Sequence, residues 1–585
     1  MITGESRAVG DRHRYAGIGD ETLVRQRVTA DLTAPGTPFE IRVAEVLGRR
    51  CRIYANAPGT LRDVYAKGAQ WHRKPAITFE GETHTWDEYL AIVARFGRAL
   101  VERFGVRKGD RVALAMRNYP EWPFVFAAAV SVGAVCVPLN SWWSGRELGY
   151  ALADCDAKVF IGDRERVELV QGIRADLPGL ETVVEVRPGE VVRGDVEWQQ
   201  LLADVPEGLD LSAVSLDADD DCTIMYTSGT TGRPKGAITT HRAHVANLYN
   251  LLVQGAIDAE LDAWRGEPAA APPEAPAALV PGPLFHVANL PKLYLAAISG
   301  RHLVFMYKWD ARRAIEIIDG LDVDGFSGVP TVIRQLLDTV EADGSTLPSL
   351  RLIGMGGAPT PASQIERIKT LFDGRVAVST GYGLTETTGG MIGISSHDFF
   401  ARPLAVGLPY PTSEVRIVGE DGADVGAGEL GEAWFKGPTV ARGYWNRTTE
   451  SFSDGGWFHS GDIVRRDEDG FIQIVDRLKD VVIRAGENVY CSEVENVLHG
   501  HPSVWDAAVF GVPHELWGEE VVAVVHTRPD AGVTEEELRA YAAGLLAPYK
   551  IPSAIFIDTE PLPRNPTGKV LKTELRQVYA DRMVR

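Results

Sequence analysis

The sequence predicts an α/β protein with a large N-terminal domain of helix-covered sheets, a small β-rich module and a small α+β C-terminal domain. Buried-strand patterns alternate with helical patterns through "DRVALAMRN", "AKVFIGD", "RHLVFM" and "LRLIGMG", which is typical of parallel sheets covered by helices. From "GELGEAWFKGP" onward, short strands and turns follow one another closely. After "DGFIQIVDRLKD" comes a compact tail with strands and helices of its own. We therefore expect the chain to divide into residues 1–478 and 479–585.

Composition and charge exclude several classes of function. The chain has 585 residues, 45% of them hydrophobic, and this composition is typical of globular domains. A net charge of −20 disfavours a nucleic-acid partner, whose phosphates would be repelled. The five cysteines are scattered without a CxxC pair, which argues against a disulfide framework or a zinc site. With neither an apolar leader nor a transmembrane run, we expect a cytoplasmic enzyme and give the sequon Asn446-Arg447-Thr448 no weight.

The N-terminal third begins with polar sequence and then becomes regular. Residues 1–35 are weakly periodic, and we expect a loose arm. The stretch "RVAEVLGRRCRIY" suggests a short amphipathic helix with a basic edge, packed on the domain rather than anchored in a membrane, although weak membrane association stays open. "AITFEGETHTWDEYLAIVARFGRALVERFG" predicts a hairpin followed by a capped helix. Further on, the Ala/Pro-rich residues 264–280 suggest a surface insertion.

The stretch "YTSGTTGRPKG" is the first candidate for a phosphate-binding loop. It does not fit the Walker A template, because the position five residues after its first glycine is Pro234. It does not fit the dinucleotide fingerprint either. Glycines let backbone N–H groups approach an oxyanion, hydroxyls add donors and a lysine adds charge. The residues that would hold phosphate in this way are Thr227, Ser228, Gly229, Thr230, Thr231, Gly232 and Lys235.

Other motifs are weak singly and informative together. "GYGLTETTG", "WFHSGDIV", "VDRLKD", "GENVY" and "LPRNPTGKVLK" follow the phosphate loop in that order. With them the chain, from about residue 60 to its end, resembles the adenylate-forming superfamily of acyl-CoA synthetases, nonribosomal adenylation domains and luciferases, and within it the fatty-acyl-CoA ligases most. The resemblance implies two steps. A carboxylate attacks the α-phosphate of ATP to give an acyl-adenylate, and the thiol of CoA then forms the thioester and releases AMP.

The resemblance also implies roles for individual residues. Lys569 would bridge the α-phosphate and the substrate carboxylate, Thr385 would contact the α-phosphate, and Glu386 would hold Mg²⁺. Asp462 and Arg477 would hold the ribose hydroxyls. His286 would stand at the acyl pocket beside the CoA tunnel, with a satisfied core histidine as the competing interpretation. The remaining ATP-binding residues would be Gly357, Ala358, Pro359, Gly381, Tyr382 beside adenine, and Gly383.

The C-terminal domain is expected to be mobile. By resemblance it rotates between the two steps about Lys479, so that Lys569 serves adenylation while the face with Gly486 and Glu487 serves CoA. The chain departs from the usual pattern at Ser460, at Arg484-Ala485 and at Cys491. The last two departures bear on CoA binding rather than on the overall chemistry.

The acid is expected to be hydrophobic. "GPLFHVANL" lacks the Asp that, in the amino-acid adenylation domains of the family it resembles, pairs with the substrate ammonium. The residues expected around the acyl group are mostly small or apolar: His286, Val287, Gly328, Val329, Gly356 and Met391. We expect a medium- or long-chain fatty acid in preference to an aryl or steroid-side-chain acid. An acyl-AMP ligase that loads a carrier protein is the closest alternative, a homodimer is left open, and a non-catalytic sensor is disfavoured because Glu386 and Lys569 are present.

Overall fold

Four large sheets and a two-stranded hairpin organise the described part of the chain in the computed structural model, which covers residues 15, 18–206, 211, 214–227, 233–267, 273–358, 360–528, 531–565 and 568–583. The first is an eight-stranded sheet in the order β21-β11-β10-β6-β5-β7-β8-β9, parallel from β10 to β9. Its strands are β5 (Arg111–Ala115), β6 (Val135–Pro138), β7 (Ala157–Asp163), β8 (Thr182–Val186), β9 (Val196–Glu197), β10 (Asp221–Thr227), β11 (Lys235–Thr240) and β21 (Gly443–Tyr444). α3 (Trp86–Arg98) and η2 (Ala99–Arg103) precede β5, and the helices between the strands are α4 (Glu121–Ser131), α5 (Gly145–Asp154), α6 (Arg164–Gln171) and α7 (Trp198–Asp204).

The second sheet has nine strands in the order β18-β17-β16-β15-β14-β12-β13-β3-β4, and its run from β16 to β3 is parallel. Its strands are β3 (Pro75–Phe79), β4 (Glu82–Thr85), β12 (Ala277–Val280), β13 (His302–Phe305), β14 (Gly325–Gly328), β15 (Leu352–Met355), β16 (Ala377–Tyr382), β17 (Ile392–Ser395) and β18 (Leu408–Pro409). The helices of this part are α2 (Leu61–Ala66), α8 (His241–Arg265), α9 (Leu290–Ser299), α10 (Ala311–Gly320), α11 (Pro330–Asp343), α12 (Ala362–Leu371) and α13 (Ser396–Ala401).

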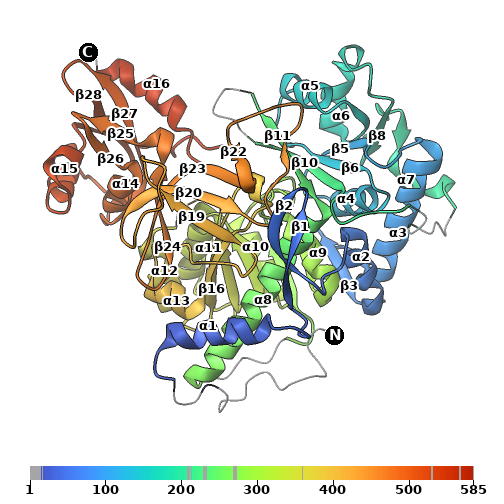
Figure 1. The fold of residues 1–585 in the computed structure, drawn as a ribbon. Coiled ribbons are helices and arrows are strands. Elements are labelled where there is room, and N and C mark those ends of the chain that lie inside the picture. The colour runs from blue at the N-terminus through green and yellow to red at the C-terminus, as the bar shows by residue number, and fades with distance from the viewer. Residues whose placement is uncertain are drawn as a thin grey trace.

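The predicted β-rich module and the C-terminal domain form the other two sheets. The module contains β19 (Glu414–Val418), β20 (Leu430–Lys436), β22 (Phe452–Ser453), β23 (Trp457–Arg466) and β24 (Ile472–Arg477). The last sheet contains β25 (Val482–Arg484), β26 (Glu487–Val489), β27 (Val504–His514), β28 (Gly518–Thr527) and β29 (Ala554–Asp558), with α14 (Cys491–His499), α15 (Glu535–Ala543) and α16 (Lys572–Met583). Figure 1 shows this α+β unit in red beside the module. The predicted fold class is thus confirmed.

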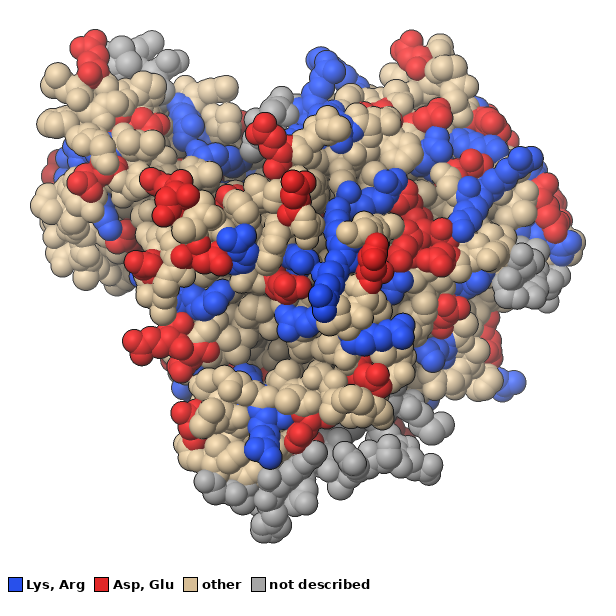
Figure 2. Space-filling view, viewed as in Figure 1, with Lys and Arg blue, Asp and Glu red and all other residues tan. Residues whose placement is uncertain are grey.

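The turn η7 (Leu478–Asp480) joins the last strand of the module to the first strand of the C-terminal sheet. The division at residues 478 and 479 stays a prediction, although the sheets change at this turn. No helix in the described part of the chain is long and apolar enough to cross a membrane. On the face drawn in Figure 2, acidic and basic side chains are interspersed, so no field of a single sign covers it.

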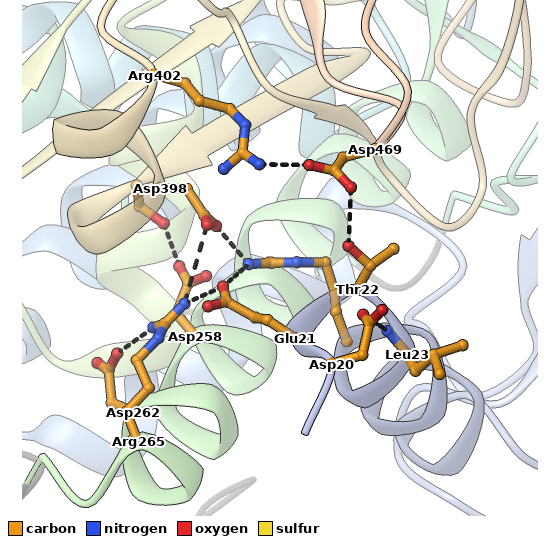
Figure 3. Close-up of polar contacts among 12 residues, drawn as sticks. Asp20, Glu21, Thr22, Leu23, Asp258, Asp262, Arg265, Asp398, Arg402 and Asp469 are labelled. Carbon is orange, nitrogen blue, oxygen red and sulfur yellow. Dashed lines mark hydrogen bonds and ion pairs between the residues drawn. The ribbon is translucent and has the colours of Figure 1, made fainter. Parts of the chain in front are cut away.

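The expectation of a loose N-terminal arm was wrong for part of that segment. Helix α1 (Glu21–Leu32) begins at Asp20, whose carboxylate accepts a hydrogen bond from the N–H of Leu23, and it buries Val24 and Val28. Figure 3 shows how charged groups hold it against α8 and α13. Its apolar residues Val24, Val28 and Leu32 form a narrow stripe, and charged side chains around them add ion pairs to α8 and α13.

Two further expectations need correction. The stretch predicted as an amphipathic helix is a hairpin of β1 (Ile41–Val46) and β2 (Arg49–Tyr54). Its two-residue turn places both Leu47 (φ 49°) and Gly48 (φ 75°) in the left-handed region, which matches a tight hairpin turn. Residues 264–280 are not a single surface insertion, because β12 lies in the middle of the second sheet and α8 extends to Arg265.

Candidate functional site

The carboxyl ends of the parallel strands of the second sheet gather the predicted motifs. Strands β12, β14, β15 and β16 are neighbours and run in the same direction, so the segments that follow them meet at one edge. Open α/β sheets bind ligands at this edge. The segments there begin at Pro281, Val329, Gly356 and Gly383, and they carry His286 and Glu386 as well as the predicted acyl-pocket residues Val329 and Gly356.

Glu386 lies on a short 3₁₀ turn, η5 (Thr385–Thr387), and is buried. One of its carboxylate oxygens, Oε1, accepts a hydrogen bond of 2.6 Å from the hydroxyl of Tyr444, and its backbone carbonyl accepts one from the N–H of Ala441. Burial first, and the adjacent carboxylate second, raise the pKa of Tyr444, so the phenol stays a donor. A buried, oriented carboxylate is the oxygen donor that Mg²⁺ prefers, so the residue fits its predicted role.

Asp462 is held rigidly between two partners. Its carboxylate accepts a hydrogen bond of 2.5 Å from the hydroxyl of Tyr382 and forms an ion pair of 3.1 Å with the guanidinium of Arg477. Asp462 is only 3% exposed. The structure therefore brings together three residues from β16, β23 and β24 that are spread over 95 positions of the sequence. The Asp462 carboxylate is fixed enough to recognise a pair of hydroxyls.

Lys569 reaches this group from the C-terminal domain. The turn that carries it is closed by the N–H of Lys569 donating to the side-chain oxygen of Asn565. Gly568 has φ +84°, and a Cβ there would lie 2.9 Å from a methyl of Val329, so the turn packs on the wall of the predicted acyl pocket. Desolvation by the surrounding protein is the main cause that lowers the pKa of Lys569, and the Arg477 cation is the second. The carboxylates of Asp462 and Glu386 oppose that shift.

His286 stands near the same lysine. Burial lowers the pKa of His286 to about 4, and the cations of Lys569 and Lys292 add to the effect. The imidazole is therefore neutral at pH 7. Its Nδ1 accepts a hydrogen bond of 3.3 Å from the N–H of Ala288, which fixes the ring orientation. The His286 side chain is partly exposed to solvent although protein surrounds it closely, which fits a residue that lines a cavity.

The phosphate loop is described at its two ends. Thr227 ends β10 and Lys235 begins β11, and the two strands pair side by side in antiparallel register. Ser228, Gly229, Thr230, Thr231 and Gly232 lie outside the described residues, as does Pro359. The role of the loop therefore stays a prediction.

A cavity of about 430 Å³ lies beside Lys235. Its lining consists of Lys235, Tyr444, Asn446, Arg447, Thr448 and Thr449. Lys235 lies over the ring of Tyr444 at 5.4 Å, Arg447 donates to the hydroxyl of Tyr150, and Arg233 lies over the Tyr150 ring at 5.8 Å. Sequence reasoning missed Arg447 because it treated its segment only as a sequon. The sequence feature that could have indicated a phosphate-binding role is an arginine followed by two threonines shortly after Tyr444.

Of the predicted acyl-pocket residues, Val329 packs against the turn that carries Lys569. A Cβ on Gly356 would meet open space, and one on Gly357 would lie 3.2 Å from a methyl of Val329. Val287 packs against Gly389. Met391 was expected in the pocket and is instead wholly buried, with its sulfur accepting hydrogen bonds from the hydroxyls of Thr439 and Ser413. Its side chain belongs to the hydrophobic cluster that it shares with Ile417 and Phe435 of the β-rich module.

The remaining predicted residues are placed as follows. Thr385 begins η5, Gly328 ends β14, Ala358 follows β15, and Gly381 and Gly383 flank Tyr382. Lys479 is exposed on η7, yet its charge still reaches Lys569. Gly486 and Glu487 are exposed at the turn between β25 and β26, so one face of the C-terminal domain meets the site while this turn faces solvent.

The fold and the site together define a nucleotide-using α/β enzyme with a separate C-terminal lobe. Residues 64–445 match the model of the AMP-binding enzyme family, and residues 493–569 match the AMP-binding enzyme C-terminal domain. The chain belongs to the AMP-binding enzyme family, and by class it is an AMP-forming acyl-CoA synthetase.

Named relatives support this assignment. A feruloyl-CoA synthase of Amycolatopsis sp is 37% identical over 508 residues, which cover 86% of this chain and 96% of that protein. The long-chain-fatty-acid–CoA ligase FadD13 of Mycobacterium tuberculosis is 35% identical over 483 residues, which cover 81% and 89%. The solved o-succinylbenzoate CoA synthetase of Bacillus subtilis with ATP and magnesium is 28% identical, with a TM-score of 0.73 over 88% of this chain and 98% of that one.

Proposed function

We propose that the protein is an ATP-dependent ligase that converts a hydrophobic carboxylic acid to its adenylate and then to its CoA thioester. The observation that carries the proposal is that the turn bearing Lys569, from the C-terminal domain, packs on Val329 at the carboxyl edge of the second sheet, with Glu386 and Asp462 within electrostatic reach of the lysine. A lysine near two placed carboxylates suits a step in which negative charge builds between a carboxylate and a phosphate.

The first step joins the acid to the α-phosphate of ATP. A carboxylate oxygen attacks phosphorus, and pyrophosphate leaves with the bonding electrons. Lys569 neutralises charge shared by the carboxylate and the α-phosphate, and the Asp462–Arg477 pair fixes the ribose. Glu386 would hold Mg²⁺, which supplies positive charge to the phosphate oxygens when bound. Arg447 and Lys235 line the cavity in which the departing pyrophosphate would lie.

The second step transfers the acyl group to sulfur. The thiol of CoA attacks the acyl carbonyl, loses its proton and expels AMP. Because the turn at Gly486 is exposed while Lys569 lies in the site, the C-terminal domain would rotate about Lys479 before this step. The neutral His286 would stand where the acyl group meets the incoming thiol.

Two classes of acid have comparable support. A medium- or long-chain fatty acid agrees with the small residues at Gly328 and Gly356 and with the relative FadD13. An aryl acid agrees with the feruloyl-CoA synthase, which is similar over a larger share of this chain. A steroid-side-chain acid would also be hydrophobic, and a carrier-protein thiol could replace CoA as acceptor.

A panel of acids tests the proposed function. The purified protein would be incubated with ATP, Mg²⁺ and each acid, with and without CoA, and AMP and thioester would be measured by mass spectrometry. We expect AMP release that depends on both the acid and CoA. Adenylate without CoA-dependent product would favour loading of a carrier protein, and no AMP with any acid would overturn the proposal.

A further inference from the structure

Helix α14 of the C-terminal domain begins without a side-chain cap of its own. Its N-cap residue is Tyr490, whose side chain accepts no hydrogen bond from the helix. The first N–H groups of a helix have no partner within the helix and need an acceptor from elsewhere. The N–H of Glu493 donates to the carbonyl of Tyr490, at 3.1 Å. The N–H of Ser492 instead donates to the carboxylate of Asp476, at 3.3 Å.

Asp476 lies on β24 of the β-rich module, so it and α14 stand on opposite sides of Lys479 in the chain. The partial positive charge at the start of a helix favours a carboxylate there. Asp476 is only 6% exposed, and the other oxygen of its carboxylate accepts a hydrogen bond of 2.7 Å from the N–H of Arg477. The first helix of the C-terminal domain is thus capped by a carboxylate of the module.

A bulge in β24 provides a second contact between the same two elements. The pairing of β24 with β23 shifts register between Ile474 and Asp476, which leaves Val475 without a partner on β23. The backbone of a bulged residue is released from the ladder. The carbonyl of Val475 accepts a hydrogen bond from the hydroxyl of Ser492. Ser492 therefore binds two consecutive residues of β24, one through its N–H and one through its hydroxyl.

The contacts on either side of Lys479 show where the chain can turn. Arg477 is anchored to the module, because it is paired with β23. The carbonyl of Asp480 is anchored to α14, because it accepts a hydrogen bond of 3.0 Å from the thiol of Cys491. Leu478 and Lys479 lie between these two anchors, and both are exposed. A rotation about Lys479 would keep the contact of Cys491 with Asp480, since both residues follow the pivot.

We infer that Asp476 is a positioning residue, which caps α14 across the hinge and so holds the C-terminal domain in the orientation that brings Lys569 to the site. The inference rests on the proposed ligase function, in which this domain turns between the two steps. Rotation about Lys479 would break both contacts of Ser492 with β24, because each contact joins the two sides of the pivot. The cap therefore favours the adenylate-forming arrangement and opposes the next one.

The cap is reversible because a buried carboxylate is costly. Burial raises the pKa of Asp476, and the Lys572 cation and two backbone N–H groups only partly oppose that shift. The ionised carboxylate is therefore less stable in this position than in water. Its exposure on rotation recovers that free energy, which offsets part of the loss of the two hydrogen bonds.

The kinetics of the two half-reactions test the inference. Asp476→Ala removes the cap, so adenylate formation should slow by about 3- to 10-fold, while thioester formation from supplied acyl-adenylate should not slow. Asp476→Asn keeps an oxygen acceptor and should stay within about threefold of the wild-type rate in both steps. Glu468→Ala, at an exposed carboxylate in the turn between β23 and β24, is the control and should change neither step.

The orientation of the domain is measured directly by the distance between two spin labels. Lys308→Cys and Leu545→Cys place one label on each lobe at exposed positions, and the natural cysteines are buried and should label slowly. With ATP and Mg²⁺ present, Asp476→Ala should shift the ratio of the two orientations away from the present one by about 3- to 10-fold. Asp476→Asn should leave the distance distribution close to that of the wild type.

The outcomes separate orientation from a merely structural role. Equal slowing of both half-reactions by Asp476→Ala, or a distance distribution that this change leaves unaltered, would overturn the inference. If that variant does not fold, Ser492→Ala removes only the hydroxyl contact with Val475 and permits the same comparison. The distance measurement requires no turnover. An unaltered distribution in a protein that releases AMP thus counts against the cap alone, whereas no AMP with any acid counts against the proposed function itself.

Discussion

Lys569 joins the two lobes at the scale of single residues, because it belongs to the C-terminal domain and acts on Glu386 and Asp462 of the N-terminal domain. Lys569→Ala should lower the rate of adenylate formation by on the order of 100-fold or more, since the charge that stabilises the transition state is removed. Thioester formation from supplied acyl-adenylate should persist. Both half-reactions would be followed by rapid quench and mass spectrometry, with Lys569→Arg as the variant that keeps the charge. Equal loss of both would contradict the assigned role.

Arg447 tests the cavity beside Lys235. Arg447→Ala should raise the inhibition constant of pyrophosphate by about tenfold, because a charge-assisted contact to phosphate is lost, and should leave inhibition by AMP unchanged. Product-inhibition kinetics measure both constants. Arg465→Ala, at an exposed arginine of β23 that does not line this cavity, is the control. If the two inhibitors weaken together, the cavity does not serve pyrophosphate.

Residue-level prediction from sequence was most specific where a motif dictates backbone geometry. The glycine at position 568 allows the turn that aims Lys569, and both residues stand out in "PTGK". Arg447 did not stand out, since it lies among hydroxyl residues. Its environment arises from segments far apart in the chain, because its guanidinium donates to the hydroxyl of Tyr150. Met391 packs among residues of the β-rich module, a neighbourhood set by contacts with segments such as Thr439 that lie far along the chain.

At the scale of elements, α1 is attached through a charged cluster. Arg25 pairs with Glu21 and Asp398, and Arg265 pairs with Glu21 and Asp262. Glu21, His397 and Asp398 have ligand atoms close enough for a metal ion, but the two guanidinium groups already neutralise the carboxylates there. Figure 3 shows Asp258 of α8 within the same cluster.

Asp258 should make the stability of this region depend on pH. Burial raises the pKa of Asp258 from 3.8 to about 6, although the hydroxyl of Ser395, the amide of Gln254 and the Arg25 cation oppose the shift. A raised carboxyl pKa means that ionising the group lowers the free energy of unfolding. This loss of stability is absent below the pKa of the unfolded state and is fully present above the pKa of the folded state. Asp258→Asn should therefore stabilise the protein by roughly 1–3 kcal/mol at pH 7.5 and by little near pH 4.

Calorimetric melting temperatures at several pH values measure this effect. Asp319→Asn, at an exposed position of α10, should show no such trend. A less stable Asp258→Asn protein at pH 7.5 would mean that the hydrogen bonds outweigh the cost of the buried charge.

Elements were predictable where periodicity and caps agree. The helix α3, with its capping box between Thr85 and Glu88, follows a hairpin as expected. The β1–β2 hairpin was missed because its turn puts a leucine, not a typical turn residue, at positive φ. Strand β12 was missed because a four-residue strand at the end of an Ala/Pro-rich stretch carries too few residues for periodicity to register.

At the scale of the whole molecule, the orientation of the C-terminal domain decides which step the site can perform. The backbone carbonyl of Trp505 in that domain accepts a hydrogen bond of 2.5 Å from Arg334 of α11, whose guanidinium lies 5.8 Å from the Trp505 ring. Gly568 packs on Val329 across the same boundary. These contacts belong to the arrangement in which Lys569 faces the nucleotide site.

Arg334→Ala should weaken that arrangement. Loss of one hydrogen bond and one cation–π contact should slow adenylate formation by about 3- to 10-fold and leave thioester formation from supplied adenylate unchanged. Arg313→Ala, which breaks only an exposed pair with Glu316, is the matched control. A variant that slows both half-reactions alike would show that the contact supports folding rather than orientation.

The fold class and the two-lobed plan were predictable because each lobe has its own succession of strands and helices. The mutual placement of the lobes was not, since the Arg334–Trp505 and Gly568–Val329 contacts join residues more than 170 positions apart.

Isotope transfer tests the central claim, adenylate formation, most directly. An acid that the panel identifies would be supplied with both carboxylate oxygens as ¹⁸O, together with ATP, Mg²⁺ and CoA. Attack on the α-phosphate leaves one carboxylate oxygen on phosphorus when the thiol later displaces AMP. We predict AMP that carries one ¹⁸O and unlabelled pyrophosphate. Unlabelled AMP, or label in inorganic phosphate, would contradict an acyl-adenylate intermediate.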